Sequence, residues 1–379
     1  MDRCDILIVG GGPAGSTLAR QLVRAGLDVV VMDRESFPRE KVCAGWITPQ
    51  VIDSLELDLT HYARQHTLQP LNAFNCGLIG GDTVTIRYPA PVSFGIRRVE
   101  FDDYLLRRSG ARLQLGEAFA QARRATDGWV VNGQWRTRLL VGAGGHFCPV
   151  ARTLGAAVGR QEGAVYAQEA EFAVGPLPIA NGHASHPPGE LFFCHDLAGY
   201  GWCLRKGEFL NVGLGRETPN GLLNAVQDFQ RWLVDTGRLP TEARPRFRGH
   251  AYLSYDRSRR PLLAANCLLV GDAAGLAYPK SGEGIRPAVE SALLAARVIG
   301  AARGDYRELA LRPYAALLAG RFGPRSATPV QSAAMPAGLL PSLRRAAARL
   351  IVANGPLARH LVLDRFFLHR TEAALHAPA

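Results

Sequence analysis

Short apolar runs that end in glycine or a charged residue divide the first part of the chain into strands and a helix. Residues 5–9 form such a run and predict a buried parallel strand. Residues 16–25 follow with apolar side chains at helical spacing, and Gly26 stands where a helix C-cap is expected. Residues 29–32 form a second buried run that ends at Asp33. These segments together predict a complete βαβ unit.

The later part of the chain repeats this pattern and adds a second one. Residues 129–141 indicate a hairpin that leads into a buried strand, and residues 267–272 form another apolar run ending at a glycine and an aspartate. Residues 101–108 predict a short helix, and residues 285–299 place apolar side chains on one face of a long helix. Residues 160–260 alternate short strands, aromatic residues and turn signals, which predicts an antiparallel sheet. We therefore expect an α/β fold with a Rossmann-like domain, an antiparallel-sheet domain and C-terminal helices.

The composition excludes several classes of protein. Hydrophobic residues make up 47% of the chain and charged residues 20%, which allows a large core and argues against disorder. No run of about 18 or more apolar residues occurs, so we expect no membrane-spanning helix. The N-terminus lacks a basic segment and a small-residue cleavage site, so we expect a cytoplasmic protein.

The net charge of +11 suggests an acidic partner, and nucleic acid is the first candidate. The basic residues are 41 arginines and three lysines, and the arginines are scattered along the chain rather than gathered into a stripe with stacking aromatics. We therefore expect no nucleic-acid partner. An anionic cofactor or an acidic membrane surface also suits the charge.

The seven cysteines do not predict a disulfide framework or a metal site. Their number is odd, none forms a CxxC pair, and none lies in a Cys/His cluster with zinc spacing. A reducing cytoplasm fits this pattern.

A glycine-rich turn between the first strand and the first helix has the spacing of a dinucleotide-binding fingerprint. Gly10 allows the tight turn, Gly12 lets a pyrophosphate approach the backbone, and Gly15 lets helix and strand pack closely. The start of the helix, at Pro13 and Ala14, then presents N–H groups to the phosphates.

The second predicted strand supplies the acidic residue that such a fingerprint requires. Asp33 ends that strand and is placed to accept hydrogen bonds from an adenosine ribose, and Arg34 beside it is a further candidate contact to the cofactor. A plain structural glycine turn is the alternative interpretation. The fingerprint alone does not distinguish NAD from FAD.

A second motif favours FAD because it resembles the second flavin-binding stretch of the FAD-dependent monooxygenase, reductase and halogenase superfamily. It consists of Gly271-Asp272-Ala273-Ala274-Gly275, followed by Pro279 and by Gly282-Glu283-Gly284-Ile285. The resemblance implies that Asp272 contacts the ribityl chain. It also implies that the helix start at Gly282, Gly284 and Ile285 faces the pyrimidine side of the flavin, where a helix N-terminus stabilises negative charge.

The stretch Arg98-x-x-Phe101-Asp102 resembles the superfamily's Arg-x-x-Phe-Asp motif. This resemblance implies that Arg98 lies against the cofactor, and a surface salt bridge is the alternative for this residue. The implied fold is the Rossmann-like FAD-binding domain of the group A flavin monooxygenase and reductase type, with an antiparallel-sheet substrate domain.

Three further segments resemble the geranylgeranyl reductase-like branch of the superfamily. They are Phe37-Pro38-Arg39-Glu40-Lys41-Val42-Cys43-Ala44-Gly45, then Tyr200-Gly201-Trp202-Cys203-Leu204-Arg205 with Gly213-Leu214-Gly215, and Arg260-Pro261-Leu262. The resemblance covers roughly residues 4–305.

The resemblance also implies three candidate catalytic residues. Cys43 matches a cysteine that lies near the flavin in that branch, where a thiol donates a proton or shapes the pocket; a small buried hydrophobe is the alternative. Tyr200 and Trp202 alternate along a strand, so both face the same side and are expected to line an apolar substrate wall. Ordinary core packing is the alternative for this pair.

The sequence departs from the superfamily at two places. Gly144 stands where the superfamily usually has an Asp that touches the cofactor, which bears on direct reduction by NADPH. Leu204-Arg205 replaces a Phe-Pro pair, so Arg205 is expected to meet an anionic or polar group of the substrate.

The resemblance implies an FAD-dependent oxidoreductase that acts on a bulky apolar or aromatic small molecule. Geranylgeranyl reductase-like reduction of C=C bonds by hydride from reduced flavin is the favoured reaction, with NADPH or an electron donor protein as the source of electrons. The alternative is a monooxygenase that uses O₂ through a C4a-hydroperoxide. A halogenase, or a flavoprotein that holds a ligand without turnover, is a weaker alternative.

We expect the FAD-binding domain to be discontinuous, assembled from residues 1–75, 95–160 and 255–310, with a substrate-binding sheet from 76–94 and 161–254. Residues 311–379 form a C-terminal helical segment. One amphipathic helix in this segment is expected to pack on the body of the chain, and peripheral membrane contact is the alternative. Its apolar and basic positions are Leu343, Arg344, Arg345, Ala347, Arg349, Leu350, Ile351, Ala353, Leu357 and Arg359.

Overall fold

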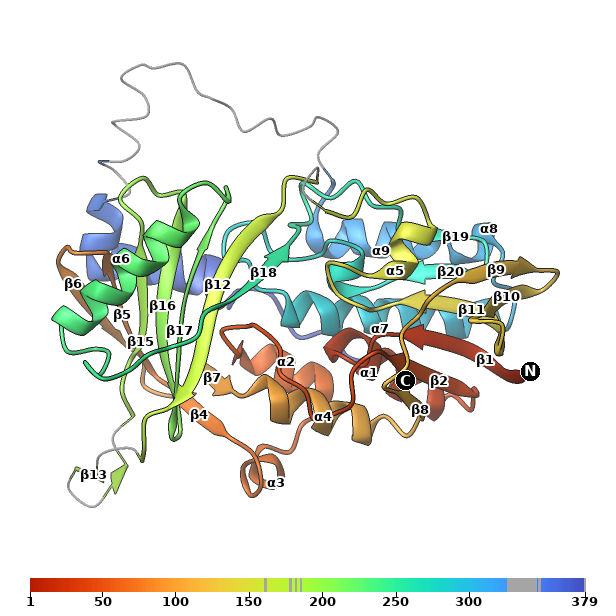
Figure 1. The fold of residues 1–379 in the computed structure, drawn as a ribbon, viewed down its shortest axis with the longest axis horizontal. Helices are drawn as coiled ribbons and strands as arrows, with labels where there is room; N and C mark the ends of the chain where they lie inside the picture. Colours follow the sequence, from red (N-terminus) through yellow and green to blue (C-terminus); the bar gives the residue numbers. More distant parts are fainter. Residues whose placement is uncertain are drawn as a thin grey trace, which may run out of the picture.

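A computed structural model of the chain describes residues 1–159, 162–176, 179–180, 183–184, 186–325, 346 and 349–377. Two large sheets lie next to each other along the long axis of the molecule (Figure 1). The first carries the N-terminal strand and the second carries the middle of the chain, and the C-terminal segment reaches both.

The first sheet has eight strands in the order β19-β20-β11-β1-β2-β8, with β10 pairing β11 and β9 pairing β10. The strands from β20 to β8 are parallel, and the predicted βαβ unit forms its centre. Ile6, Leu7 and Ile8 of β1 have no exposed surface, because a parallel sheet is covered on both faces. The strands are β1 (Asp2–Val9), β2 (Val29–Asp33), β8 (Arg112–Leu115), β9 (Ala122–Ala125), β10 (Gly128–Val131), β11 (Trp135–Gly142), β19 (Leu263–Ala264) and β20 (Cys267–Leu269).

Three helices position the chemistry of this sheet. α1 (Pro13–Arg24) packs against both α4 (Arg98–Arg108) and α7 (Ile285–Ala302). α1 begins three residues before the predicted start because proline fits the first turn of a helix, and Gly26 with φ of +80° follows its end. α4 also begins three residues early, so Arg98 belongs to its first turn. The prediction of the long helix α7 is confirmed.

Shorter helices surround this core. α2 and α9 pack against α7, α5 packs against β11, and α8 packs against β19. These and the remaining short helix are α2 (Pro49–Leu55), α3 (Leu59–Ala63), α5 (Pro149–Thr153), α8 (Glu308–Leu311) and α9 (Pro313–Phe322). Within the part of the chain that the structure describes, no helix is long and apolar enough to span a bilayer.

The second sheet has seven strands in the order β18-β12-β17-β16-β15-β5-β6. The predicted antiparallel pairing is confirmed for five of the six neighbouring pairs of this sheet. The exception is β15 with β5, which run parallel; β5 and β6 come from an earlier part of the chain. The strands are β5 (Ala73–Leu78), β6 (Thr83–Arg87), β12 (Val165–Ala173), β15 (Gly189–Phe193), β16 (Gly199–Lys206), β17 (Phe209–Arg216) and β18 (Arg248–Tyr252).

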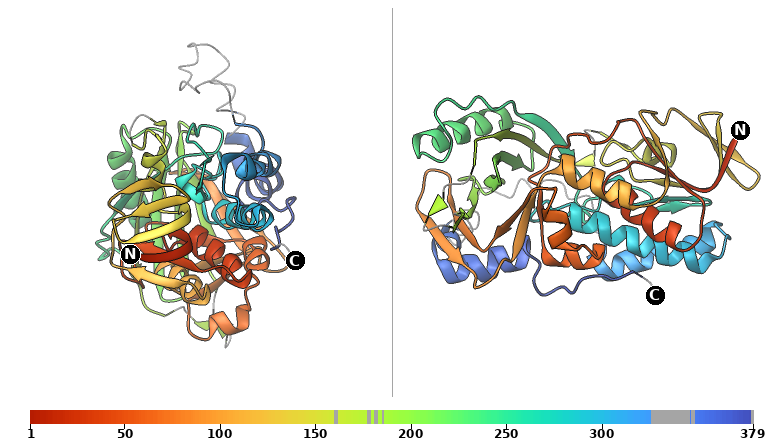
Figure 2. Two further views of the ribbon diagram at one scale, coloured as in Figure 1. Left: turned by 90° about the vertical axis from the view of Figure 1, so that its right-hand side faces the viewer. Right: turned by 90° about the horizontal axis from the view of Figure 1, so that it is seen from below.

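Side chains alternate between the two faces of this sheet. Phe192 and Cys203 face α6 (Leu222–Asp235), while Leu191 and Trp202 face a C-terminal segment with π-type hydrogen bonding (Ala358–Phe367). Figure 2 shows this segment beside β5 and β6. The sheet is therefore covered on both faces by helices of the same chain.

Two small sheets complete the fold of the residues that the structure describes. β3 (Trp46–Ile47), β7 (Ser93–Ile96) and β4 (Leu68–Leu71) form one between the large sheets, and β13 (Ile179–Ala180) pairs with β14 (His183–Ala184).

The tail does not form the single amphipathic helix predicted for it. The helix that includes residues 349–353 stops at Asn354, whose side chain caps the short helix α11 (Gly355–Leu357) by accepting the Leu357 N–H at 3.2 Å. An asparagine at this place satisfies the new helix start and so divides the segment. The predicted tail positions Leu343, Arg344, Arg345 and Ala347 lie outside the described residues.

Candidate active site

The N-terminus of α1 presents unpaired N–H groups to the loop before it. Gly12 is the N-cap, Pro13 follows, and the first turn has no acidic residue. The first helical hydrogen bond runs from the Ser16 N–H to the Gly12 carbonyl at 2.9 Å, so the earlier N–H groups have no acceptor within the helix. A Cβ atom on Gly12 would lie 3.5 Å from Nη2 of Arg39, which adds a positive charge beside the turn. This arrangement suits a phosphate group.

Two glycines of the same turn are required by close packing. Gly10 has φ of +116°, and a Cβ atom there would lie 2.4 Å from the carbonyl oxygen of Ala143. A Cβ atom on Gly15 would lie 1.9 Å from the Gly10 carbonyl oxygen. Only glycine lets β1, β11 and α1 approach this closely, as the fingerprint spacing predicts.

Asp33 ties the end of β2 to the glycine-rich turn. Its Oδ2 accepts the Gly11 N–H at 2.7 Å, and its Oδ1 accepts the Glu35 N–H at 3.0 Å. Arg34 has an exposed side chain that donates to Glu35 Oε1 at 3.1 Å rather than to the turn. Ala14 is buried in the first turn of α1.

The turn after β20 places Asp272, which is half-buried, near the start of α7. A Cβ atom on Gly284, the N-cap of α7, would lie 3.0 Å from Asp272 Oδ1. Burial raises the pKa of Asp272, although the positive charges of Lys41, Arg98 and Arg260 oppose this rise. Asp272 therefore sits among several cations without a direct ion pair, within the described residues.

Arg260 explains the Arg-Pro-Leu segment seen in the sequence. Its Nη1 donates to the carbonyl oxygens of Asp272 and Ala273, both at 3.1 Å, and its Nε donates to Glu162 at 2.7 Å. Gly271, with φ of +59°, donates its N–H to Ser291 Oγ at 3.0 Å. The backbone around Asp272 is therefore held from two sides.

Two residues to which the sequence assigned no role lie beside these groups. Nζ of Lys41 is 3.2 Å from both ring nitrogens of His250, a histidine that the sequence gave no role. Burial, and then the positive charge of Arg98, lower the pKa of Lys41 to about 8. Burial also lowers the pKa of His250 well below its ordinary value. The signals available for Lys41 were the scarcity of lysine in this chain and its place in the Phe37–Gly45 segment.

Cys43 lies between the flavin-motif residues and the second sheet. It is partly exposed, whereas the other six cysteines are buried, and all seven are free thiols. Its N–H donates to Glu169 Oε2 at 3.3 Å, and its carbonyl accepts from Asn211 Nδ2 at 3.1 Å. Burial by itself would lower the pKa of Arg98, and the neighbouring Asp102 carboxylate and Cys43 thiol raise it.

Tyr200 and Trp202 form an aromatic wall with residues distant in sequence. Their ring centroids are 6.0 Å apart, which confirms that they share one face of β16. Phe367 of the C-terminal segment lies 5.1 Å from Tyr200 and 5.7 Å from Trp46, with which it stacks. The Tyr200 hydroxyl donates to the carbonyl of Ser281, in the loop before α7. The wall is therefore connected to the second flavin motif.

Gly213 makes room for the indole of Trp202. The two residues face each other across β16 and β17, and a Cβ atom on Gly213 would lie 2.2 Å from the Trp202 ring. This contact gives a physical reason for glycine in the Gly213-Leu214-Gly215 segment.

The expectation for Arg205 is wrong. Its Nε donates to the Gly207 carbonyl at 2.7 Å and its Nη2 donates to the Gly175 carbonyl, so the guanidinium binds backbone at the hairpin end. Leu204 is fully buried against the C-terminal segment. Alternation along β16 sends neighbouring side chains to opposite faces, and this places Arg205 away from Trp202.

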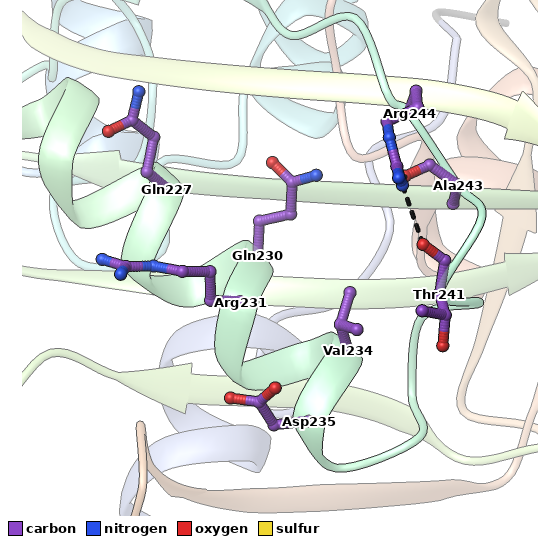
Figure 3. Close-up of a pocket in the computed structure, with 8 residues that line it drawn as sticks. All are labelled: Gln227, Gln230, Arg231, Val234, Asp235, Thr241, Ala243 and Arg244. Atoms are coloured by element: carbon purple, nitrogen blue, oxygen red, sulfur yellow. Dashed lines mark hydrogen bonds between the residues drawn. The ribbon is translucent and has the colours of Figure 1, made fainter.

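A separate surface cavity of about 510 Å³ lies outside this site (Figure 3). It is lined by side chains of α6, most of them polar, and by Thr241, Ala243 and Arg244. None of the predicted site residues lines it, so it does not enter the assignment of function.

The donors and acceptors of the site fit FAD. A helix N-terminus with Arg39 beside it suits the pyrophosphate, and the carboxylate of Asp33 at the end of β2 suits ribose hydroxyls. A half-buried carboxylate, Asp272, stands at the second helix start, where the flavin end of the cofactor is expected.

Comparisons with known proteins agree with this chemistry. Residues 5–171 match the family model described as FAD dependent oxidoreductase. The chain is 31% identical over 348 residues to a menaquinone reductase of Mycobacterium tuberculosis, covering 85% of this chain and 81% of the relative. It is 27% identical over 314 residues to a geranylgeranyl diphosphate reductase of Rhodobacter capsulatus, covering 74% of this chain and 71% of the relative.

Among solved structures, the fold resembles a geranylgeranyl bacteriochlorophyll reductase-like protein from Thermoplasma acidophilum. The TM-score is 0.70 at 19% identity, covering 93% of this chain and 88% of that one. The fold and site define an FAD-dependent oxidoreductase, and the chain belongs to that family of enzymes. Similarity to two proteins that carry geranylgeranyl reductase names agrees with the resemblance seen in the sequence.

Proposed function

We propose that this enzyme reduces carbon–carbon double bonds of a bulky apolar or aromatic substrate. The aromatic wall of Trp46, Tyr200, Trp202 and Phe367 carries the proposal, because the Tyr200 hydroxyl joins it to the Ser281 carbonyl. An apolar wall next to the flavin motifs is what an apolar substrate requires. Relatives with names of reductases support reduction over the oxygenase alternative.

The proposal assigns FAD to the two helix starts described above. When bound, FAD supplies hydride from its reduced ring, and the protein supplies position and electrostatics. The α1 turn and Asp33 hold the adenosine and pyrophosphate end, and the Asp272 turn with the start of α7 holds the flavin end. The proposed cofactor contacts are Gly10, Gly12, Pro13, Ala14, Gly15, Asp33, Arg34, Arg98, Gly271, Asp272, Gly282, Gly284 and Ile285.

Three residues have proposed roles at the substrate. Cys43 supplies the proton that accompanies hydride transfer, since it is the partly exposed thiol and lies beside the Arg98 guanidinium. Tyr200 and Trp202 orient the substrate by apolar contact. The first sheet then serves as the FAD-binding domain and the second as the substrate-binding domain.

Two electrons per turnover come from outside the protein, and NADPH or an electron donor protein is the proposed source.

Peripheral contact with an acidic membrane is also proposed, because Leu350, Leu357 and Leu361 are exposed and Arg349 and Arg365 accompany them. Sedimentation with anionic vesicles and no sedimentation with neutral ones is the expected result. Equal behaviour with both vesicle types would refute the charge-based contact.

Anaerobic reduction of the purified flavoprotein tests the proposed reaction. A polyprenyl substrate such as menaquinone or geranylgeranyl diphosphate is added to the reduced protein without oxygen, and the product mass is measured. Gain of two hydrogens with reoxidation of the flavin supports the proposal. Gain of one oxygen after admission of air would establish the monooxygenase alternative instead.

The Asp272→Ala variant tests the cofactor placement independently of any substrate. We expect it to retain FAD at least about tenfold less tightly, because a carboxylate proposed to contact the cofactor is lost. Asp228→Ala, which removes an exposed carboxylate of α6 paired with Arg231, is the control and keeps its flavin. Flavin content after gel filtration, read from the visible absorption spectrum, is the measurement. Normal content in Asp272→Ala would place the flavin elsewhere.

A further inference from the structure

A buried polar network lies beneath the Cys43 segment, on the second sheet. Glu169 of β12 is 6% exposed, and its two carboxylate oxygens have different partners. Oε2 accepts the Cys43 N–H at 3.3 Å, and Oε1 accepts from Asn211 Nδ2 at 2.6 Å. Because Asn211 Nδ2 also lies 3.1 Å from the Cys43 carbonyl oxygen, the two side chains hold the N–H and the carbonyl of Cys43.

The orientation of Asn211 is determined by Trp202. The indole Nε1 of Trp202 lies 2.8 Å from the Asn211 amide, and an indole N–H is a donor only. The amide oxygen must therefore face Trp202, and the amide NH₂ must face Glu169 and the Cys43 carbonyl. Asn211 thus connects the substrate wall to the segment that carries the proposed proton donor.

The charged groups around Glu169 leave it without a cation of its own. On β12, Glu171 accepts from Lys206 Nζ at 2.7 Å and from Arg97 Nε at 2.9 Å, so it takes both nearby positive charges. Across the sheet on β18, Arg248 lies opposite Glu169 but directs its guanidinium to Glu40. No ion pair to Glu169 occurs within the described residues.

We propose that Glu169, together with Asn211, is a positioning residue that holds the Cys43 segment and that its charge determines how firmly it does so. The proposal rests on the proposed function only for the role of Cys43. As a carboxylate, Glu169 makes a charge-assisted hydrogen bond to the Cys43 N–H. As a neutral acid it is a weaker acceptor, and the segment is held less firmly.

Glu169 changes between its charged and neutral forms near neutral pH, so the difference in how firmly these forms hold the Cys43 segment falls in that pH range. Burial raises the pKa of Glu169 to about 7, with Lys206 opposing and Glu171 adding to the rise. The hold on Cys43 is therefore expected to strengthen as the pH rises through neutrality. A more firmly held segment exposes the Cys43 thiol less, so the thiol is expected to be less reactive at higher pH than it would otherwise be.

The test measures the reactivity of Cys43 toward iodoacetamide in the flavin-loaded wild type and in Glu169→Gln. Glutamine keeps the shape of the neutral acid but does not ionise. At about pH 5.5 the two proteins should react at the same rate, whereas at about pH 8.5 the variant should react roughly tenfold faster. Modification is located by mass spectrometry, and the six buried cysteines report any unfolding.

Glu190→Gln is the matched control. Glu190 lies on the same sheet and accepts from Arg238 at 3.0 Å and from Asn75 at 3.2 Å, without a contact to the Cys43 segment. The ratio of the Cys43 alkylation rate in Glu190→Gln to the rate in wild type should not depend on pH. If the ratio of alkylation rates for Glu169→Gln and wild type is also constant between about pH 5.5 and pH 8.5, the proposal is overturned.

A second variant keeps the test decisive if Glu169→Gln loses its flavin. Asn211→Ser removes the donor to the Cys43 carbonyl, and we expect it to alkylate faster than wild type at every pH. An unchanged rate would refute the role of Asn211. Because alkylation needs no substrate, its result remains valid even if the proposed reaction is wrong. If the proposed reaction is right, kcat of the wild type should change near neutral pH as Glu169 ionises. This pH-dependent change in kcat should be absent from Glu169→Gln, while KM stays similar.

Discussion

The Asp102 carboxylate holds Arg98 by two hydrogen bonds of 2.7 Å, and Asp102 has no exposed surface. Arg39 forms a further ion pair with the same carboxylate at 2.9 Å. One buried anion therefore orients two guanidinium groups, one beside the glycine-rich turn and one beside Cys43. Burial opposes ionisation of Asp102, but Arg98 and Arg39 lower its pKa below the ordinary value.

Replacing Asp102 by Asn should strongly destabilise the protein. The variant leaves Arg98 and Arg39 without a counter-charge, and loss of one partner of a buried pair costs about 3–5 kcal/mol of unfolding free energy. Asp103→Asn is the control, because Asp103 pairs with a half-exposed Arg107 at 3.1 Å and should cost under about 1 kcal/mol. Urea unfolding of both variants measures the difference. Equal costs would show that the Asp102 pair is no stronger than a surface pair.

The carboxyl group of Glu283, in the loop before α7, should make the free energy of unfolding depend on pH. Both of its carboxylate oxygens are buried without a hydrogen-bond partner among the described residues. Burial raises its pKa from 4.5 to about 8, although Arg286 opposes the rise. In the unfolded chain Glu283 ionises near its ordinary pKa, so its contribution to stability is complete at low pH and is lost as the pH rises toward 8.

Glu283→Gln should therefore remove part of this pH dependence from the flavin-free protein. Unfolding free energies are measured by urea at about pH 5 and about pH 8.5. Wild type should lose stability relative to the variant between these two values. Glu308→Gln, which changes an exposed residue of α8, should differ from wild type equally at both. A pH-independent difference for Glu283→Gln would mean that the folded protein does not keep this carboxyl neutral.

Phe367 should contribute more to stability than its position near the C-terminus suggests. It is 6% exposed and contacts Trp46 and Tyr200 across the substrate face of the second sheet. Truncation to Ala should cost about 3–5 kcal/mol, since a buried aromatic side chain leaves a cavity. It should also raise KM for an apolar substrate, because the wall loses one ring. Leu361→Ala on the same segment, 38% exposed, is the control and should cost under about 1 kcal/mol. Similar losses from both variants would contradict the packing role.

The sequence by itself determined the local features of the cofactor site. The apolar runs, the glycine spacing and Asp33 depend on neighbours within about thirty residues, and such patterns specify a βαβ unit with a phosphate-binding turn. Tyr200 and Trp202 were placed on one face by strand alternation alone, which the contact between their rings confirms.

Only the tertiary structure decided which distant residues complete the site. The partners of Cys43 are Glu169 and Asn211, and strand alternation does not reveal that the Cys43 segment lies over that face of β12 and β17. Phe367 reaches the aromatic wall because the tail crosses the second sheet, and Arg205 turns to backbone carbonyls because its face of β16 points away. Long-range pairing brings these groups together, and no local periodicity encodes it, because each contact depends on the packing of elements far apart in the chain.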